Sequence, residues 1–167
     1  MLPPISDTMG LSDWERILGS YCSQITLLSE IPVTRVEITQ IGHRLRTLMQ
    51  RSQVTELKRQ FARYRCTWIV YMAAVAARND DRGYWAALGE SLGIALTLAQ
   101  CQSLGASFLD AVSELGLHTF EAAGGYRYVT PIRLHGGIPA YSLPDFFEFL
   151  VLPAVQDRKY AGMTPDQ

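Results

Sequence analysis

The stretch from Leu57 to Ala77, LKRQFARYRCTWIVYMAAVAA, constrains the fold more than any other part of this chain. Its large apolar residues recur every three or four positions, as on one face of an α-helix: Leu57, Phe61, Tyr64, Trp68, Met72 and Val75. From Trp68 onward almost every position is apolar, so the second half of this helix has no side suited to water. We therefore predict a central helix around which the other helices of a bundle pack.

The composition is that of a folded globule. A chain of 167 residues suffices for one domain that buries about two-thirds of its unfolded surface. The contents of 48% hydrophobic and 19% charged residues argue against disorder. The longest apolar run, Trp68–Ala77, has about half of the roughly 20 residues that a membrane span needs, and no signal-peptide pattern is visible. We expect a cytoplasmic protein without membrane contact.

Three cysteines fit a reducing compartment. Cys22, Cys66 and Cys101 each lie within a helical pattern, so we interpret them as buried thiols. A disulfide between two of them, with the third left free, is the alternative.

Helix-end signals divide the rest of the chain. Ser12-x-x-Glu15 is a capping box, and the helix that it begins should end near Glu30. A second capping box, Thr34-x-x-Glu37, begins the next helix. The apolar stripe of that helix loses phase at Ser52–Thr55, which predicts a break before the central helix.

Beyond the central helix, which should end at about Arg78, the residues 79–83 form a turn by composition. Two further helices are predicted, from Tyr84 to about Gly93 and from Leu98 to Leu115. Gly116 is well placed to close the second of them.

The segment Gly124–Pro144, GGYRYVTPIRLHGGIPAYSLP, is rich in Gly, Pro and Tyr. An edge strand from Tyr126 to Leu134 competes with a one-turn helix from Thr130 to Gly136, and we favour the helix. A terminal helix should begin at Ser142. The predicted fold is all-α: an orthogonal or irregular bundle of five to six helices, with a Gly/Pro-rich irregular segment before the last.

We expect one helical domain over residues 1–167. Thr164-Pro165-Asp166 has the composition of a further helix start, which suggests a domain excised from the N-terminus of a longer protein. The segment Tyr126–Phe149 resembles stretches in the helical N-terminal regions of large multidomain bacterial proteins, including those of phage-defence or mobile-element loci. The resemblance is confined to this segment, carries no family name and transfers no catalytic residue.

One motif superficially indicates a hydrolase. Gly89-Glu90-Ser91-Leu92-Gly93 matches the nucleophile elbow G-x-S-x-G, and His135-Gly136-Gly137 is similar to an esterase oxyanion loop. The elbow requires a strand before its serine and an oxyanion loop earlier in the chain, and this sequence has neither. A hydrolase that uses Ser91 and His135 therefore remains a remote alternative, and we assign no catalytic residue.

No cofactor or metal site is predicted. His43, His118 and His135 form no metal-ligand spacing with another His, Cys or carboxylate, and no phosphate-binding glycine motif occurs. The carboxylates of Asp110 and Glu114 are four residues apart, which we interpret as a solvated helix face.

The charge distribution is the stronger functional signal. Although the net charge is −1, residues 35–65 hold eight basic residues against two glutamates. Guanidinium groups along adjoining helices suit phosphates or acidic protein surfaces, although a merely solvated face is also compatible. The candidate binding residues are Arg44, Arg46, Arg51, Lys58, Arg59, Arg63 and Arg65.

We therefore expect a non-catalytic interaction domain that binds a protein partner, or another domain of the same polypeptide, through this basic helical face. Binding of the DNA or RNA phosphate backbone by the same arginines is the alternative. A second surface is predicted at Tyr126, Tyr128, His135 and Tyr141, unless these residues only close the end of the bundle.

Overall fold

The computed structural model describes residues 9–51, 54–78, 83–122 and 124–137. The described residues form helices and no strands, which confirms the all-α prediction. Seven α-helices and two 3-10 turns are described: α1 (Leu11–Cys22), η1 (Leu28–Glu30), α2 (Arg35–Arg51), α3 (Val54–Arg63), α4 (Arg65–Arg78), α5 (Tyr84–Leu92), α6 (Leu98–Glu114), η2 (Gly124–Tyr126) and α7 (Val129–Gly136). None of these helices combines the length and apolar character needed to cross a bilayer.

Several predicted features lie outside the described residues. They are the turn at 79–82, the irregular segment after residue 137, the terminal helix from Ser142 and the helix start at Thr164. The predicted break near residues 52–55 falls where α2 ends and α3 begins, on either side of the undescribed residues 52–53.

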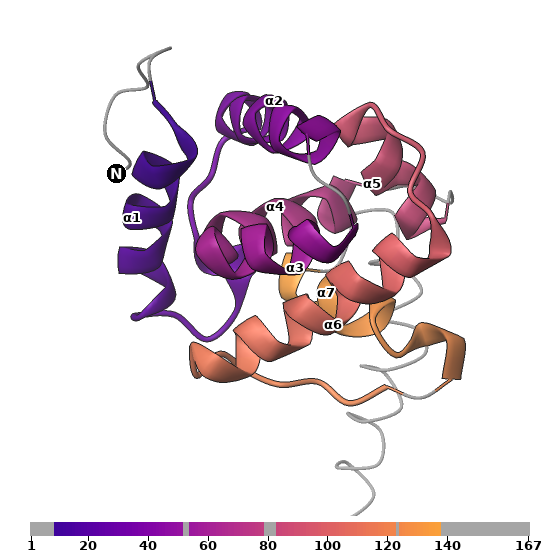
Figure 1. Ribbon diagram of the computed structural model, residues 1–167. Coiled ribbons are helices and arrows are strands. Elements are labelled where there is room, and N and C mark those ends of the chain that lie inside the picture. The colour runs from indigo at the N-terminus through magenta and orange to yellow at the C-terminus, as the bar shows by residue number, and fades with distance from the viewer. Residues whose placement is uncertain (1–8, 52–53, 79–82, 123, 138–167) are drawn as a thin grey trace, which may run out of the picture. The chain divides into compact units, whose positions relative to one another are not determined.

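Helix α4 is the centre of the described bundle (Figure 1). It contacts each of the other six described α-helices, and ten of its 14 residues are buried. Trp68 and Met72 share one face of α4 and Ile69 lies on another, yet all three side chains are fully inaccessible to water. The uniformly apolar second half of the predicted central helix is therefore explained, because α4 has neighbours on every side.

The predicted central helix is divided into α3 and α4 at Tyr64. At the start of α4, the carboxylate of Glu15 accepts hydrogen bonds from the backbone N–H groups of Cys66 (3.0 Å) and Thr67 (2.9 Å) and from the Thr67 hydroxyl (2.9 Å). The first N–H groups of a helix have no partner within it, so Glu15, a residue of α1, acts as the cap of α4.

The predicted capping box at Ser12 is consequently wrong. Helix α1 begins one residue earlier, and its cap involves Gly10, whose N–H donates to the carboxylate of Asp13 at 3.0 Å. Glu15 has a partner 51 residues away instead of the nearby N–H of Ser12.

The predicted end of α1 near Glu30 is also wrong, because the helix ends at Cys22. Two side chains there satisfy a backbone carbonyl of the last turns: the Ser23 hydroxyl and the Gln24 amide donate to the oxygen of Ser20 at 2.9 and 3.1 Å. Such local side-chain bonds compete with continued helical pairing.

Other helix ends agree with the sequence. Thr34 and Glu37 form the predicted reciprocal cap of α2. Helix α5 ends before Gly93, and Gly116 closes α6 with a φ of 70°, a value that glycine adopts without strain. The favoured helix within Gly124–Pro144 is confirmed as α7, which starts one residue before Thr130 and ends at the predicted Gly136.

Two glycines let helices approach closely. A Cβ atom on Gly136 would overlap the carbonyl oxygen of Ala73 and lie 3.2 Å from the nitrogen of Ala77. A Cβ on Gly105 of α6 would lie 2.8 Å from a ring carbon of Tyr128. Helix α7 therefore packs directly against the backbone of α4.

The cysteines are core thiols, as predicted. Cys22, Cys66 and Cys101 are all buried and free. A hydrogen bond with Cys22, together with burial, raises the pKa of the Cys66 thiol, which therefore stays protonated at neutral pH.

Candidate anion-binding cleft

A cleft of about 520 Å³ lies between α2, α4 and α5. This volume is within the range of sites that hold small ligands or side chains of a partner. Its polar lining comes from all three helices: Arg35, Thr39, His43, Arg46, Tyr71, Arg78, Glu90 and Ser91.

Helical spacing explains why these residues meet. On α2, Arg35, Thr39, His43 and Arg46 are separated by four, four and three positions, so they follow one face. On α4, Tyr71 and Arg78 are two turns apart. The reciprocal cap at the start of α2 orders the turn that carries Arg35.

Helices α2 and α4 run antiparallel along the cleft. Gly42 lies against Tyr71, because a Cβ atom on this glycine would be 2.9 Å from the tyrosine hydroxyl. Arg35, at the start of α2, and Arg78, at the end of α4, both line the cleft. The start of α2 therefore faces the end of α4, and the middle of α2 faces Tyr71.

The floor of the cleft is a fixed hydrogen-bond chain. The Tyr71 hydroxyl donates to Oγ of Ser91 at 2.8 Å, and Oγ of Ser91 donates to the carbonyl of Leu88 at 2.8 Å. Burial raises the pKa of Tyr71, although its bond to Ser91 has the opposite effect. The phenol is thus neutral at physiological pH. The Ser91 proton points to its own helix, and Ser91 lies within α5 instead of on a strand-to-helix turn.

The cleft is strongly basic. Arg35, Arg46 and Arg78 line it together with His43, and Glu90 is the carboxylate among its lining residues. Among the described residues, no ion pair joins any of the three arginines to a carboxylate. Burial, with a smaller contribution from the charge of Arg35, lowers the pKa of Arg78. Arginine nevertheless stays protonated, so two guanidinium charges line one cleft, and neither forms an ion pair with a carboxylate of the described residues.

Arg46 is held at the α5 side of the cleft. A Cβ atom on Gly93 would lie 2.8 Å from Nε of Arg46, so the guanidinium packs on the bare backbone at the end of α5. A larger residue at position 93 would displace this side chain.

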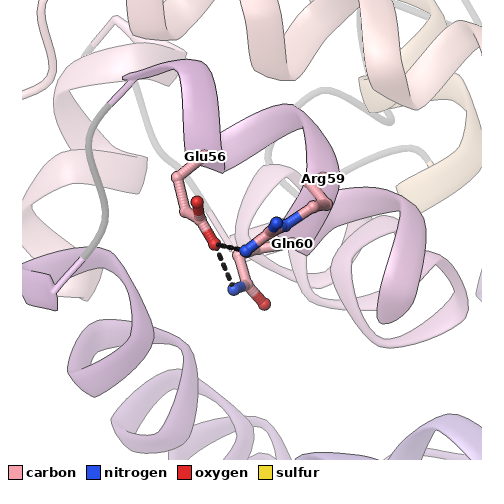
Figure 2. A network of polar contacts seen from close by, with 3 residues as sticks. All are labelled: Glu56, Arg59 and Gln60. Atoms are coloured by element: carbon pink, nitrogen blue, oxygen red, sulfur yellow. Dashed lines mark hydrogen bonds and ion pairs between the residues drawn. The ribbon is translucent and has the colours of Figure 1, made fainter.

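The remaining predicted basic residues do not join this cleft. Arg44 is exposed on α2, and the side chain of Arg51 lies outside the description. On α3, Lys58, Arg59 and Arg63 are exposed. Figure 2 shows Arg59 and Gln60 converging on the carboxylate of Glu56, with Gln60 at 2.9 Å.

Two further arginines already have partners. Arg65 pairs with Glu114 of α6 at 3.0 Å, and the guanidinium of Arg63 lies 5.3 Å from the ring centre of Tyr64. The structure therefore divides the predicted basic face: Arg46 lines the cleft, while the α3 side is a surface of mixed charge.

The predicted second surface is mostly not exposed where it is described. His135 is fully buried; its Nε2 bonds the carbonyl of His118 at 2.8 Å, and its Nδ1 accepts from the N–H of Leu28 at 3.5 Å. Burial lowers its pKa, which keeps the ring neutral. Tyr128 is half-buried against Gly105. Tyr141 and the side chain of Tyr126 lie outside the description.

Sequence reasoning missed Arg35, His43, Tyr71 and Arg78 as site residues. The spacing of Arg35, His43 and Arg46 on one helical face was the available signal on α2. Nothing local indicated that Tyr71 and Arg78, within the most apolar helix, would meet that face.

The described residues contain no group of three or more His, Cys, Asp or Glu side chains able to hold a metal ion. Comparison with protein-family models, curated proteins and solved structures gave no match for this chain.

Proposed function

We propose that this protein is a non-catalytic interaction domain that binds an acidic segment of a protein partner in the cleft between α2, α4 and α5. The observation that carries the proposal is the convergence of Arg35, Arg46 and Arg78 with His43 on a cleft whose lining includes one carboxylate. Complementary charge of this kind speeds encounter and selects acidic partners. We place this binding in the cytoplasm, where the buried thiols stay reduced.

Two features favour binding over catalysis. The Ser91 hydroxyl is engaged with Tyr71 and with the carbonyl of Leu88, so its proton is not directed to a general base. His135, the other residue of the hydrolase alternative, is buried against Leu28 and His118.

Binding of a nucleic-acid backbone is the second candidate. Lys58 and Arg63 favour it, because both are exposed on α3 and form no ion pair with a described carboxylate. The ion pairs Arg59–Glu56 and Arg65–Glu114 place negative charge on the same side, which suits a protein surface better than a polyanion.

The test is fluorescence anisotropy with a labelled Asp/Glu-rich peptide, a neutral peptide of equal length, and single- and double-stranded oligonucleotides, each across a salt series. We expect the acidic peptide to bind and the neutral peptide not to bind. Arg78→Gln should weaken binding about tenfold, which corresponds to one charge-assisted hydrogen bond of about 1.5 kcal/mol.

Arg59→Gln is the matched control, because Arg59 is also an exposed arginine but lies outside the cleft. The affinity of this variant for the acidic peptide should equal that of the unmodified protein. Oligonucleotide binding that depends on Lys58 and Arg63, without binding of the acidic peptide, would replace this proposal with the nucleic-acid alternative.

A further inference from the structure

The two ends of the cleft differ in charge, and this difference indicates which anion each end accepts. Arg35 begins α2 and lines the cleft together with Arg78 at the end of α4, while His43 and Arg46 lie two to three turns further along α2. Eleven residues separate Arg35 from Arg46, a rise of about 16 Å along the helix. One small anion cannot contact both ends.

We propose that Arg35 and Arg78 bind a phosphate monoester on a phosphorylated side chain of the partner; this inference rests on the function proposed above. His43 and Arg46 then bind an acidic residue further along the same segment of the partner.

Geometry favours a phosphate over a carboxylate at the Arg35–Arg78 end. A carboxylate can accept hydrogen bonds from two guanidinium groups, but its single negative charge balances only one of them. A phosphate monoester has three terminal oxygens, so two forks can bind it together.

The charges agree with this assignment. A monoester carries about −1.5 to −2 charges at pH 7, which matches two guanidinium groups, whereas a carboxylate carries one. Without a ligand, Arg35 and Arg78 repel each other, and no described carboxylate forms an ion pair with either. A dianion between them removes this repulsion and satisfies both.

The Arg46 end suits a single carboxylate. Arg46 packs on Gly93, and His43 lies on the same face of α2. An extended peptide rises about 3.3 Å per residue, so a span of about 16 Å corresponds to about five residues. We therefore expect the acidic residue about five positions from the phosphorylated one.

The experiment uses three peptides of one sequence, with phosphoserine, glutamate or serine at the central position and a glutamate five residues away. Isothermal titration calorimetry measures their affinities for the full chain. We expect the phosphopeptide to bind at least tenfold more tightly than the glutamate peptide.

Two variants separate the two ends. Arg35→Gln should reduce the preference for the phosphoserine peptide over the glutamate peptide to about twofold. Arg46→Gln should lower the affinity for all three peptides by a similar factor. Arg59→Gln should change none of the affinities. The arginines concerned are exposed, and a thermal unfolding curve for each variant verifies that it is folded.

The failures are distinguishable. Equal affinity for the phosphoserine and glutamate peptides would overturn the phosphate assignment and leave the acidic-partner function standing. No binding of any peptide would overturn both. Free O-phosphoserine that binds as tightly as the phosphopeptide would assign the cleft to a small phosphorylated molecule instead of a protein partner.

Discussion

The most informative stability test is Glu15→Ala. Glu15 belongs to α1, yet its carboxylate accepts three hydrogen bonds at the start of α4, from the N–H groups of Cys66 and Thr67 and from the Thr67 hydroxyl. The substitution removes all three acceptor contacts at once. It leaves two backbone donors at the start of the central helix without a protein partner.

The expected loss of stability is about 2 to 3 kcal/mol. Loss of a helix cap costs about 0.5–2 kcal/mol, and a hydrogen bond to a charged group contributes about 1.5–3 kcal/mol. The site is partly buried, so water replaces the carboxylate only in part. For a protein of this length, a loss of this size lowers the Tm by about 4 to 12 °C.

Urea denaturation followed by tryptophan fluorescence measures the effect, since Trp14 and Trp68 are both in the core. Glu114→Ala is the control: it also breaks one inter-helix contact of a glutamate, the exposed ion pair with Arg65, and should cost at most about 1 kcal/mol. If the two variants lose equal stability, Glu15 does not have the capping role that we assign to it.

Three further predictions concern the core. Gly136→Ala should lower the unfolding free energy by about 1–3 kcal/mol, since the added methyl group overlaps the Ala73 carbonyl; Gly125→Ala, with open space around it, should change the urea midpoint little. Burial lowers the pKa of His135 in the folded state, so its contribution to the unfolding free energy should be fully present above the unfolded-state pKa of about 6.5. As the pH falls below that value, the unfolding free energy should decrease by at most about 1.4 kcal/mol per pH unit. Urea titrations at several pH values should show that His135→Phe has lost this pH dependence. In a thiol-titration assay, the unfolded protein should react at all three cysteines, Cys22, Cys66 and Cys101, whereas the native protein should react slowly because they are buried. A fast reaction of the native protein would contradict their burial.

Local signals in the sequence predicted local structure well. The reciprocal cap of Thr34 and Glu37, the glycine that closes α6 and the short helix α7 each depend on residues a few positions apart. Glu15 shows where this reasoning fails. Its spacing from Ser12 satisfied the capping-box pattern, but its carboxylate accepts hydrogen bonds from the start of α4 instead.

The site was less predictable than the fold. Charge counting found the basic segment but could not separate Arg46, which lines the cleft, from Arg59 and Arg65, which pair with glutamates. Glu56 lies three residues before Arg59 on α3, a local signal that charge counting does not use. The pair Arg65–Glu114 and the shared cleft of Arg35 and Arg78, by contrast, depend on how helices pack. Such contacts follow from tertiary structure and leave no short-range pattern.

The central position of α4 determines whether its backbone amides become exposed by local or by global unfolding. A helix at the surface can fray and expose its amides while the rest stays folded, but α4 has neighbours on every side. Water can reach the amides of Ile69 and Met72 only if several surrounding helices separate together. Hydrogen exchange there should therefore proceed through global unfolding, so the slowest amides of α4 report the free energy of the whole helical unit.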